Sequence, residues 1–326
     1  MRKGISQTTV AEQAGVSTMT VSRVLSKPEI VDEETKERVF AAIAKTGYAV
    51  QKRTRTVAVL VSSMHHSAFT PLIEGVSEVV TKEGYDIILG NIGYSEDQEY
   101  RVIRTIIGRR PDGIVITSNP TCQKTRRLLK SSSIPIVEVW NVPEKSIDMA
   151  AGYSSEEAGR VAADYLLDKG YKHLAFFGTE FIRDMSRWKG FSDQVSKRKA
   201  SPAEFIKLTS EDDVDHDFNM GYKFLDDWKD NASKIDAVYC SSDVLASAIV
   251  FEGLRRGMRF PDDLAVCGFG DSAFASSMVP ALTSMRIHDF KMGEKAGEMV
   301  MTRIKGQRLP KKKITFDPVL IERETT

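Results

Sequence analysis

The pattern of apolar and polar positions changes character near residue 56. Up to about Tyr48, apolar residues recur at helical spacing and no strand-like alternation is present. The first predicted helix ends at Gly15, Ser17 caps a second over residues 18–25, and Asp32 caps a third. Two short helices joined by a tight glycine-containing turn, and then a third, are typical of a helix-turn-helix head.

Beyond residue 56, apolar β-branched runs alternate with helical patterns. Runs typical of buried strands recur at residues 57–61, 86–90, 113–117, 134–139, 173–178, 205–208, 237–240 and 265–268. Helical patterns lie among them at residues 71–84, 97–108, 155–170, 187–197, 220–230 and 244–257, and a final strand is expected at residues 313–317. This alternation predicts an α/β body of parallel sheets covered by helices. Some 270 residues exceed one typical domain, so two lobes are expected.

Composition supports an ordinary globular protein. The chain has 326 residues, of which 41% are hydrophobic and 28% charged. No apolar run is long enough to span a bilayer, and no apolar segment follows the basic start as a secretory signal requires. Three widely spaced cysteines, Cys122, Cys240 and Cys267, indicate a reducing compartment. We therefore expect a cytoplasmic protein.

The net charge of +1 conceals an asymmetry. Residues 1–55 carry ten basic and six acidic side chains, a net charge of +4, and the remainder carries −3. A basic head on a slightly acidic body suggests a nucleic-acid-binding module attached to a second function. We predict a DNA-binding domain at 1–48, a short basic linker at 49–56 and a two-lobe domain at 57–326.

The second helix of a helix-turn-helix presents its first residues to base edges in the major groove. Here those residues are Ser17, Thr18, Met19, Thr20, Ser22 and Arg23. A guanidinium such as that of Arg23 binds a guanine edge through two hydrogen bonds. Phosphate contacts, which set position rather than sequence, are expected from Ser6, Ser26 and Lys27. The alternative is a hydroxyl-rich helix that is merely solvated.

Residues 9–25 resemble the N-terminal signature of the LacI/GalR family of bacterial repressors. Its most specific parts are Ala14-Gly15-Val16-Ser17 and Thr20-Val21-Ser22-Arg23. The resemblance extends through nearly the whole chain. It implies a homodimeric DNA-binding transcriptional regulator with a periplasmic-binding-protein-like effector domain. It also implies that Thr18 and Met19 select the operator and that Tyr48 contacts the DNA backbone.

The linker departs from that family. Relatives usually carry a hinge helix whose leucine wedges into the minor groove and kinks the operator. Residues 49–56 contain no leucine and leave no room for that helix, although Arg53 and Arg55 keep the tether basic. We therefore predict weaker or less effector-sensitive operator binding. The alternative function is a cytoplasmic sugar-binding sensor with weakened DNA binding.

In a two-lobe α/β body, ligands bind at the carboxyl ends of strands and between the lobes. Side chains with suitable chemistry follow the predicted strands at His66, Phe69, Tyr94, Glu138, Trp140, Arg187, Ser242, Asp243 and Asp271, and His288 follows near the C-terminal crossover. Arg187 is the strongest candidate because a guanidinium clamps a carboxylate or adjacent hydroxyls. The alternative is a surface arginine on a helix.

The family resemblance sharpens this set. Arg187-Trp188-Lys189-Gly190-Phe191 looks like the motif whose arginine contacts the effector. Ser155 and Ser242 occupy positions where relatives carry asparagine, and Gly270 stands where many carry a sugar-binding aspartate. Other segments, such as Gly93-Tyr94-Ser95, look closest to the gluconate-operon-repressor group, which responds to sugar acids. Loss of an acidic residue at position 270 suits an anionic ligand.

Two other classes of protein are disfavoured. A solute-binding protein for transport predicts an export signal and no helix-turn-helix, the reverse of this sequence. An enzyme is disfavoured because no glycine-rich phosphate loop, nucleophile elbow or zinc-ligand pattern is present. The adjacent pair His65-His66 would point in opposite directions on an extended chain, which argues against a shared metal. We expect no cofactor and no metal, and a homodimer that binds operator DNA, a small sugar or sugar acid, and no membrane.

Overall fold

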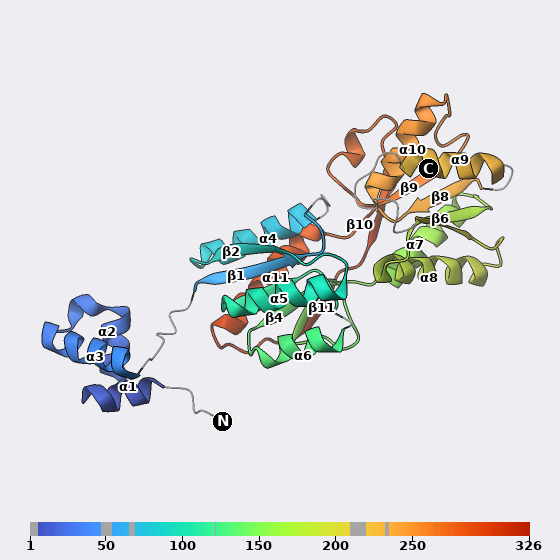
Figure 1. Ribbon diagram of the computed structural model, residues 1–326. Coiled ribbons are helices and arrows are strands. Elements are labelled where there is room, and N and C mark those ends of the chain that lie inside the picture. The colour runs from blue at the N-terminus through green and yellow to red at the C-terminus, as the bar shows by residue number, and fades with distance from the viewer. Residues whose placement is uncertain (1–5, 47–53, 65–68, 121, 209–219, 232–234) are drawn as a thin grey trace. The chain divides into compact units, whose positions relative to one another are not determined.

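The computed structural model describes residues 6–46, 54–64, 69–120, 122–208, 220–231 and 235–326 (Figure 1). The chain divides into two compact units, residues 1–53 and 54–326. We call the described part of the first unit the head and that of the second the body. Each is described by itself.

The head is a small helical unit. It consists of α1 (Gln7–Ala14), α2 (Thr18–Ser26), a 3-10 turn at Pro28–Ile30 and α3 (Glu33–Thr46) around a core that includes Val10, Val21 and Val39. The predicted caps are present. The Ser17 hydroxyl accepts a hydrogen bond from the Thr20 amide at 3.0 Å, and Gly15 turns the chain with a φ of 65°. Asp32 accepts from the Thr35 amide at 2.8 Å.

The body contains two six-stranded sheets. The first, in the order β11-β5-β4-β3-β1-β2, is formed by β1 (Thr56–Val61), β2 (Asp86–Asn91), β3 (Gly113–Ile116), β4 (Ile136–Asn141), β5 (Met149–Tyr153) and β11 (Lys313–Thr315). The second, in the order β12-β10-β9-β8-β6-β7, is formed by β6 (Leu174–Thr179), β7 (Glu204–Leu208), β8 (Ala237–Cys240), β9 (Ala265–Gly270), β10 (Thr283–Arg286) and β12 (Val319–Ile321). We call the parts built on them the N-lobe and the C-lobe.

Helices pack against both sheets (Figure 1). The N-lobe carries α4 (Phe69–Lys82), α5 (Glu96–Gly108), α6 (Gln123–Ser131) and α11 (Asp289–Ile304), and the C-lobe carries α7 (Ser155–Asp168), α8 (Ile182–Lys197), α9 (Met220–Asn231) and α10 (Asp243–Arg255). Neighbouring strands are parallel except β10 and β12. The chain passes between lobes after β5, after β10 and after β11. The predicted fold class is therefore confirmed: a small helix-turn-helix head and a two-lobe α/β body.

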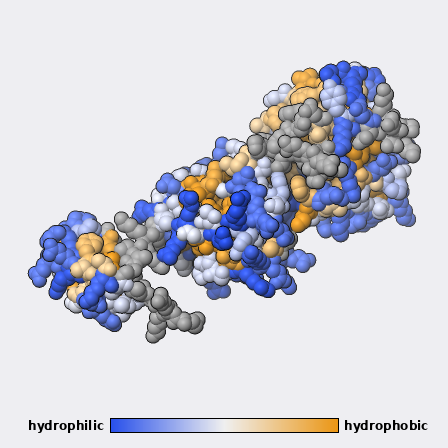
Figure 2. Space-filling view, viewed as in Figure 1, coloured by the Kyte–Doolittle hydropathy of each residue, from blue (hydrophilic) through white to orange (hydrophobic). Residues whose placement is uncertain are grey.

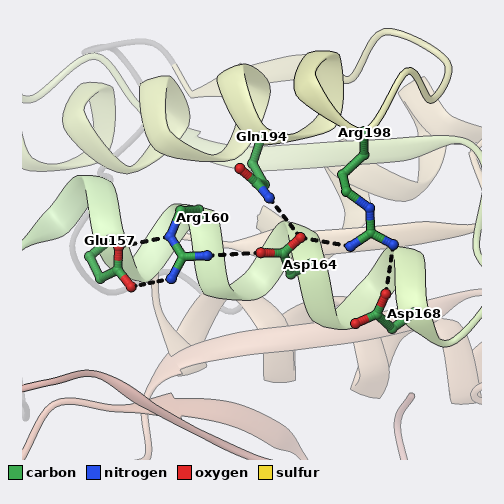
Figure 3. Close-up of polar contacts among 6 residues, drawn as sticks. All are labelled: Glu157, Arg160, Asp164, Asp168, Gln194 and Arg198. Carbon is green, nitrogen blue, oxygen red and sulfur yellow. Dashed lines mark hydrogen bonds and ion pairs between the residues drawn. The ribbon is translucent and has the colours of Figure 1, made fainter.

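The backbones of α7 and α8 pack so closely at two glycines that not even a Cβ fits between them. A Cβ added at Gly159 would lie 2.0 Å from the Arg187 carbonyl oxygen, and one at Gly190 would lie 1.9 Å from the Glu156 carbonyl oxygen. Polar contacts extend the same interface (Figure 3). Asp164 on α7 accepts hydrogen bonds from Gln194 at 2.7 Å and from Arg198 at 2.8 Å. The position of α8 is thus closely fixed.

The face of the body in Figure 2 is largely polar, with apolar patches between. Among the described residues, no helix is both long and apolar enough to cross a membrane. The three cysteines are free thiols. Nor does the described part of the chain bring three metal-ligating side chains together.

Candidate functional site

A cavity of about 70 Å³ lies between the two lobes of the body. We call it the interlobe cavity. Its lining comes from the ends of β2, β4, β5, β6, β8, β9 and β10 and from the starts of α8 and α10: Tyr94, Trp140, Tyr153, Thr179, Phe181, Arg183, Asp184, Arg187, Ser241, Ser242, Leu245, Phe269, Gly270 and Ile287. The site is therefore at the carboxyl edge of both sheets, where the strand order predicts it.

Trp140 forms the N-lobe wall. It is the last residue but one of β4 and has an unusual conformation, with a φ of 79°, and its ring stacks on Phe69 at 4.3 Å between centroids. On the adjacent strand, a Cβ at Gly152 would lie 1.8 Å from the Trp140 carbonyl oxygen. A non-glycine residue at positive φ is strained and persists only where its surroundings impose it. Gly152 allows the close approach that this conformation requires.

Arg187 projects from α8 into the cavity and is buried. Its guanidinium forms an ion pair with Asp184, and its Cζ lies 3.8 Å from the centroid of the Phe269 ring. Asp184 is held in turn by the Thr179 amide at 3.0 Å and the Thr179 hydroxyl at 2.8 Å. Burial opposes the charge on Arg187, but attraction to Asp184 raises the pKa above its ordinary value. Its Nε is buried without an acceptor among the described residues.

Arg183 is a cavity residue that the sequence analysis did not single out. It lies one turn before Arg187, and its Cζ is 4.3 Å from the centroid of the Trp140 ring, a cation–π contact between the lobes. Burial lowers the pKa of its guanidinium. Its Nη1 is buried and has no hydrogen-bond acceptor in the described part of the chain. The sequence signal that could have identified Arg183 is its i, i+4 spacing from Arg187, which places both side chains on the same face of the helix.

Several predicted effector residues lie in or directly behind this cavity. Tyr94, Arg187 and Ser242 line it. Phe69 lies behind Trp140. Asp243 is buried below the loop after β9, where it accepts hydrogen bonds from the Ser272 amide at 2.6 Å and the Ser284 hydroxyl at 2.5 Å. Burial raises the pKa of Asp243. Because Asp243 is engaged in these contacts, its role is to support the loop after β9.

Other predicted effector residues do not line the interlobe cavity. Glu138 is fully buried and accepts from the Ile147 amide at 2.5 Å, so it anchors a loop of the N-lobe. Ser155 is buried in α7. Asp271 is held at 2.6 Å by both Arg286 and Arg323. Asp271 and His288 line a separate cavity of about 660 Å³. His66 lies outside the described residues.

In the head, the start of α2 presents an exposed surface. Thr18, Met19, Ser22 and Arg23 are exposed, Met19 to 63%. The hydroxyls of Ser6 and Ser17 accept hydrogen bonds from backbone amides at the starts of α1 and α2, so these two residues are helix caps. The Thr20 hydroxyl lies 2.9 Å from that of Ser17. Lys27 is exposed just after the helix.

The remaining predicted DNA contacts fall elsewhere. Tyr48, Arg53 and the side chain of Ser26 lie outside the described residues. Arg55 is exposed but belongs to the body, where its amide donates to Asp112 at 2.8 Å. A helix-turn-helix head and a two-lobe body with an interlobe cavity lined by aromatic and charged side chains, carried by one chain, define a class of protein: transcriptional regulators with a ligand-binding body.

Comparison with known families supports this class. Residues 8–51 match the family described as bacterial regulatory proteins, lacI family, and residues 163–326 match the periplasmic binding protein-like domain. The chain belongs to the LacI family of bacterial regulatory proteins. It is accordingly a DNA-binding transcriptional regulator and not an enzyme.

Individual relatives agree over nearly the full length. The HTH-type transcriptional regulator GntR of Pseudomonas aeruginosa is 29% identical over 97% of this chain and 94% of its own. The HTH-type transcriptional repressor PurR of Vibrio vulnificus is 29% identical over 97% of both chains. The crystal structure of a LacI-family transcriptional regulator from Silicibacter pomeroyi has a TM-score of 0.80 at 25% identity and covers 98% of each chain.

Proposed function

We propose that this protein is a dimeric repressor whose operator affinity is controlled by a sugar acid, such as gluconate, bound in the interlobe cavity. The observation that carries the proposal is the charge of that cavity. Two guanidiniums, those of Arg183 and Arg187, line it together with one carboxylate, that of Asp184. Asp184 is already bound to Arg187, so an anionic ligand supplies the missing negative charge.

Sequence similarity alone does not select the ligand class. Relatives named GntR and PurR are equally identical to this chain, at 29%. The end of β9 favours an acid, because Gly270 places no second carboxylate on the cavity wall. A carboxylate there would repel an anionic ligand. Hydroxyl groups of the ligand have partners in the polar side chains of Thr179, Ser241 and Ser242.

The size of the cavity links binding to lobe movement. A cavity needs about 10–15 Å³ of such volume for each water molecule, so a cavity of about 70 Å³ holds only a few waters. A six-carbon sugar acid is larger and requires the lobes to separate or the lining side chains to move. A ligand that binds one lobe arrangement better than another shifts the population toward it. We propose that this shift changes the placement of the two heads in the dimer.

The head contributes DNA recognition to the proposal. Thr18, Met19 and Arg23 are exposed at α2 and would read base edges, with Thr20 and Ser22 beside them. Lys27, Ser26 and the cap residues Ser6 and Ser17 would contact phosphates, and Tyr48, Arg53 and Arg55 would follow the backbone. Paired heads read half-sites that are about one helical turn apart.

The body contributes dimerisation. We propose α4 and α10 as its surfaces, and exposed apolar residues on α10, Phe251 at 47% and Leu254 at 42%, support this role. We also propose that the domains are residues 1–48, 49–56 and 57–326 and that the protein acts in the cytoplasm, where operator DNA is found.

Thermal-shift measurements with gluconate, ketogluconates, galactonate and neutral sugars test the ligand class. A specific ligand stabilises the folded protein by mass action, by about 2.7 kcal/mol at a hundredfold excess over Kd, and therefore raises the melting temperature. We expect a sugar acid to do so. If only neutral sugars raise the melting temperature, the sugar-acid proposal is wrong.

Arg187→Ala tests the site. The variant should lose the response of operator binding to the ligand and keep the operator affinity of the ligand-free protein, measured on a duplex selected from a random pool. Lys189→Ala, on the exposed side of the same helix, is the matched control. An unchanged response in Arg187→Ala would remove Arg187 from the site.

A further inference from the structure

Arg183 is placed where electrostatics opposes a cation. It is the second residue of α8, one turn before Arg187, and Phe181 offers no side-chain cap to this helix start. The amino end of a helix carries a partial positive charge, so a guanidinium there is unfavourable. Like charges at i, i+4 repel as well. A sequence that violates two local rules at one position marks a functional position.

The neighbours of Arg183 do not neutralise it. Asp184 is ion-paired with Arg187 and hydrogen-bonded by Thr179. Asp289 is buried near the Trp140 indole, and burial raises the pKa of Asp289 to about 7, so its negative charge is incomplete. Within the described residues, Arg183 makes no ion pair, its Nη1 has no hydrogen-bond acceptor, and its guanidinium lies over the ring of Trp140.

Arg183 also separates two cavities. A second cavity of about 170 Å³ lies in the N-lobe half of the cleft and shares Tyr94, Phe181 and Arg183 with the interlobe cavity. Its wall carries hydroxyl and amide groups, those of Ser62, Ser95, Thr117, Ser118 and Asn119, and also two carboxylates, those of Glu96 and Glu99. The rings of Tyr94 and Phe181 stack across the lobes at 4.6 Å beside this partition. A movement of Arg183 would join the two spaces and admit a longer polyhydroxylated ligand.

We infer that Arg183 is the specificity-determining residue of the site: it binds the carboxylate of the ligand and thereby selects an acid over its neutral counterpart. Arg187 is already paired with Asp184 and offers its free Nε to a ligand oxygen of either kind. The inference rests on the proposed function, because it assigns one end of the proposed sugar acid to a named side chain. A guanidinium suits this role through its fork of parallel donors.

The test compares two ligands that differ only at one end. D-gluconate and D-glucitol have the same carbons and differ only in a carboxylate against a hydroxymethyl group. Calorimetric affinities for both are measured on wild type, Arg183→Gln, Arg187→Gln and Lys189→Gln; galactonate and galactitol serve in the same way. Arg183→Gln should lower the affinity for the acid about ten- to hundredfold and change that for the alditol little, since hydrogen bonds to charged groups are the strong ones.

The controls isolate the charge at position 183. Arg187→Gln should lower the affinity for both ligands. Lys189→Gln, which removes an exposed charge from the same helix, should change neither affinity. Arg183→Lys keeps the charge without the fork and should retain part of the acid preference, and melting curves show whether each variant is folded. If wild type binds an acid and Arg183→Gln keeps the same acid-to-alditol ratio, the inference fails and the proposed function stands. If wild type binds neither acid, both fail.

Discussion

The side chain of Trp140 shows how much of the site depends on one backbone conformation. Its positive φ turns the end of β4 so that the ring faces Arg183 on one side and Phe69 on the other. Gly152 on β5 leaves the space for this turn. The ligand wall is therefore set by a residue that never reaches the cavity.

Gly152→Ala should disturb this wall. The added Cβ would lie 1.8 Å from the Trp140 carbonyl oxygen, so the strand pair must shift. Overpacking of this kind costs about 1–3 kcal/mol of unfolding free energy. Urea unfolding should show this loss, and calorimetry should show weakened ligand binding. Gly108→Ala is the control, because no atom lies within 4 Å of its added Cβ; an equal loss in both variants would contradict the explanation.

Asp289→Asn should change the pH dependence of stability. Asp289 is buried near Trp140, Asp243 and Arg183, and its pKa is raised to about 7, against about 3.9 in an unfolded chain. As the pH rises from 4 to 7, the unfolded chain loses this proton before the folded protein does, so wild-type stability falls through that window by at most about 1.4 kcal/mol per pH unit.

The variant lacks this titration. The difference in melting temperature, variant minus wild type, should therefore grow from pH 5 to pH 7 and level off above it. Comparing the two proteins in the same buffers cancels the other titrating groups. A difference that stays constant across this range would show that Asp289 titrates at its ordinary pKa.

Cavity residues could be predicted where a side chain of suitable chemistry comes soon after a strand. Tyr94, Arg187 and Ser242 were predicted from strand ends and line the interlobe cavity. Arg183 was not, because only the helix register and the burial around Trp140 distinguish it from a surface arginine. Glu138 lies in the same strand as Trp140, but its carboxylate binds the loop amide of Ile147 and does not line the cavity. The two side chains face differently because Trp140 has a positive φ near the strand end.

Among the elements, the pair α7–α8 carries the ligand site on a tightly packed support. Its backbones meet at Gly159 and Gly190, and Asp164 connects Arg160, Gln194 and Arg198 along the interface (Figure 3). This packing determines where Arg183 and Arg187 project. The helix interface is thus part of the mechanism although it contacts no ligand.

Asp164→Asn should loosen this support. The amide replaces an acceptor oxygen with a donor that faces other donors, but the group is partly exposed, so a loss of about 1 kcal/mol or less is expected. The loss should shrink in 1 M NaCl, where charges are screened within about 3 Å. Asp193→Asn, which removes a more exposed ion pair with Lys189, should lose less. Equal losses would show that the network has no special role.

The alternation of apolar runs predicted most elements, because buried parallel strands have a distinctive composition. Among the α-helices and strands of the described residues, five were not predicted: α6, β5, β10, α11 and β12. β5 reads Met149-Ala-Ala-Gly-Tyr153, with small residues instead of branched ones, and at Gly152 the Trp140 carbonyl oxygen leaves no room for a Cβ. α11 mixes charged residues with glycines that let it approach α4, where a Cβ at Gly293 would lie 2.2 Å from the Leu72 carbonyl oxygen.

For the whole molecule, the short linker makes a prediction about DNA. Residues 49–56 lack the leucine that relatives insert into the minor groove, and without such a wedge the duplex keeps more of its base stacking. The bend of a bound operator, measured by gel mobility of circularly permuted fragments, should be smaller than with hinge-bearing relatives. A bend of equal size would contradict this prediction.

Because the chain passes between the lobes three times, a lobe cannot be cut out or exchanged with a relative as one segment. The C-lobe is made of residues 155–286 and 319–326, and the N-lobe takes β11 and α11 from beyond the second passage. Neither half is one continuous stretch of polypeptide, so no single cut releases either of them intact. A chimera that borrows the arginine-bearing half from a relative must therefore transplant two separate stretches, and a transplant that omits the second would leave β10 without its antiparallel neighbour.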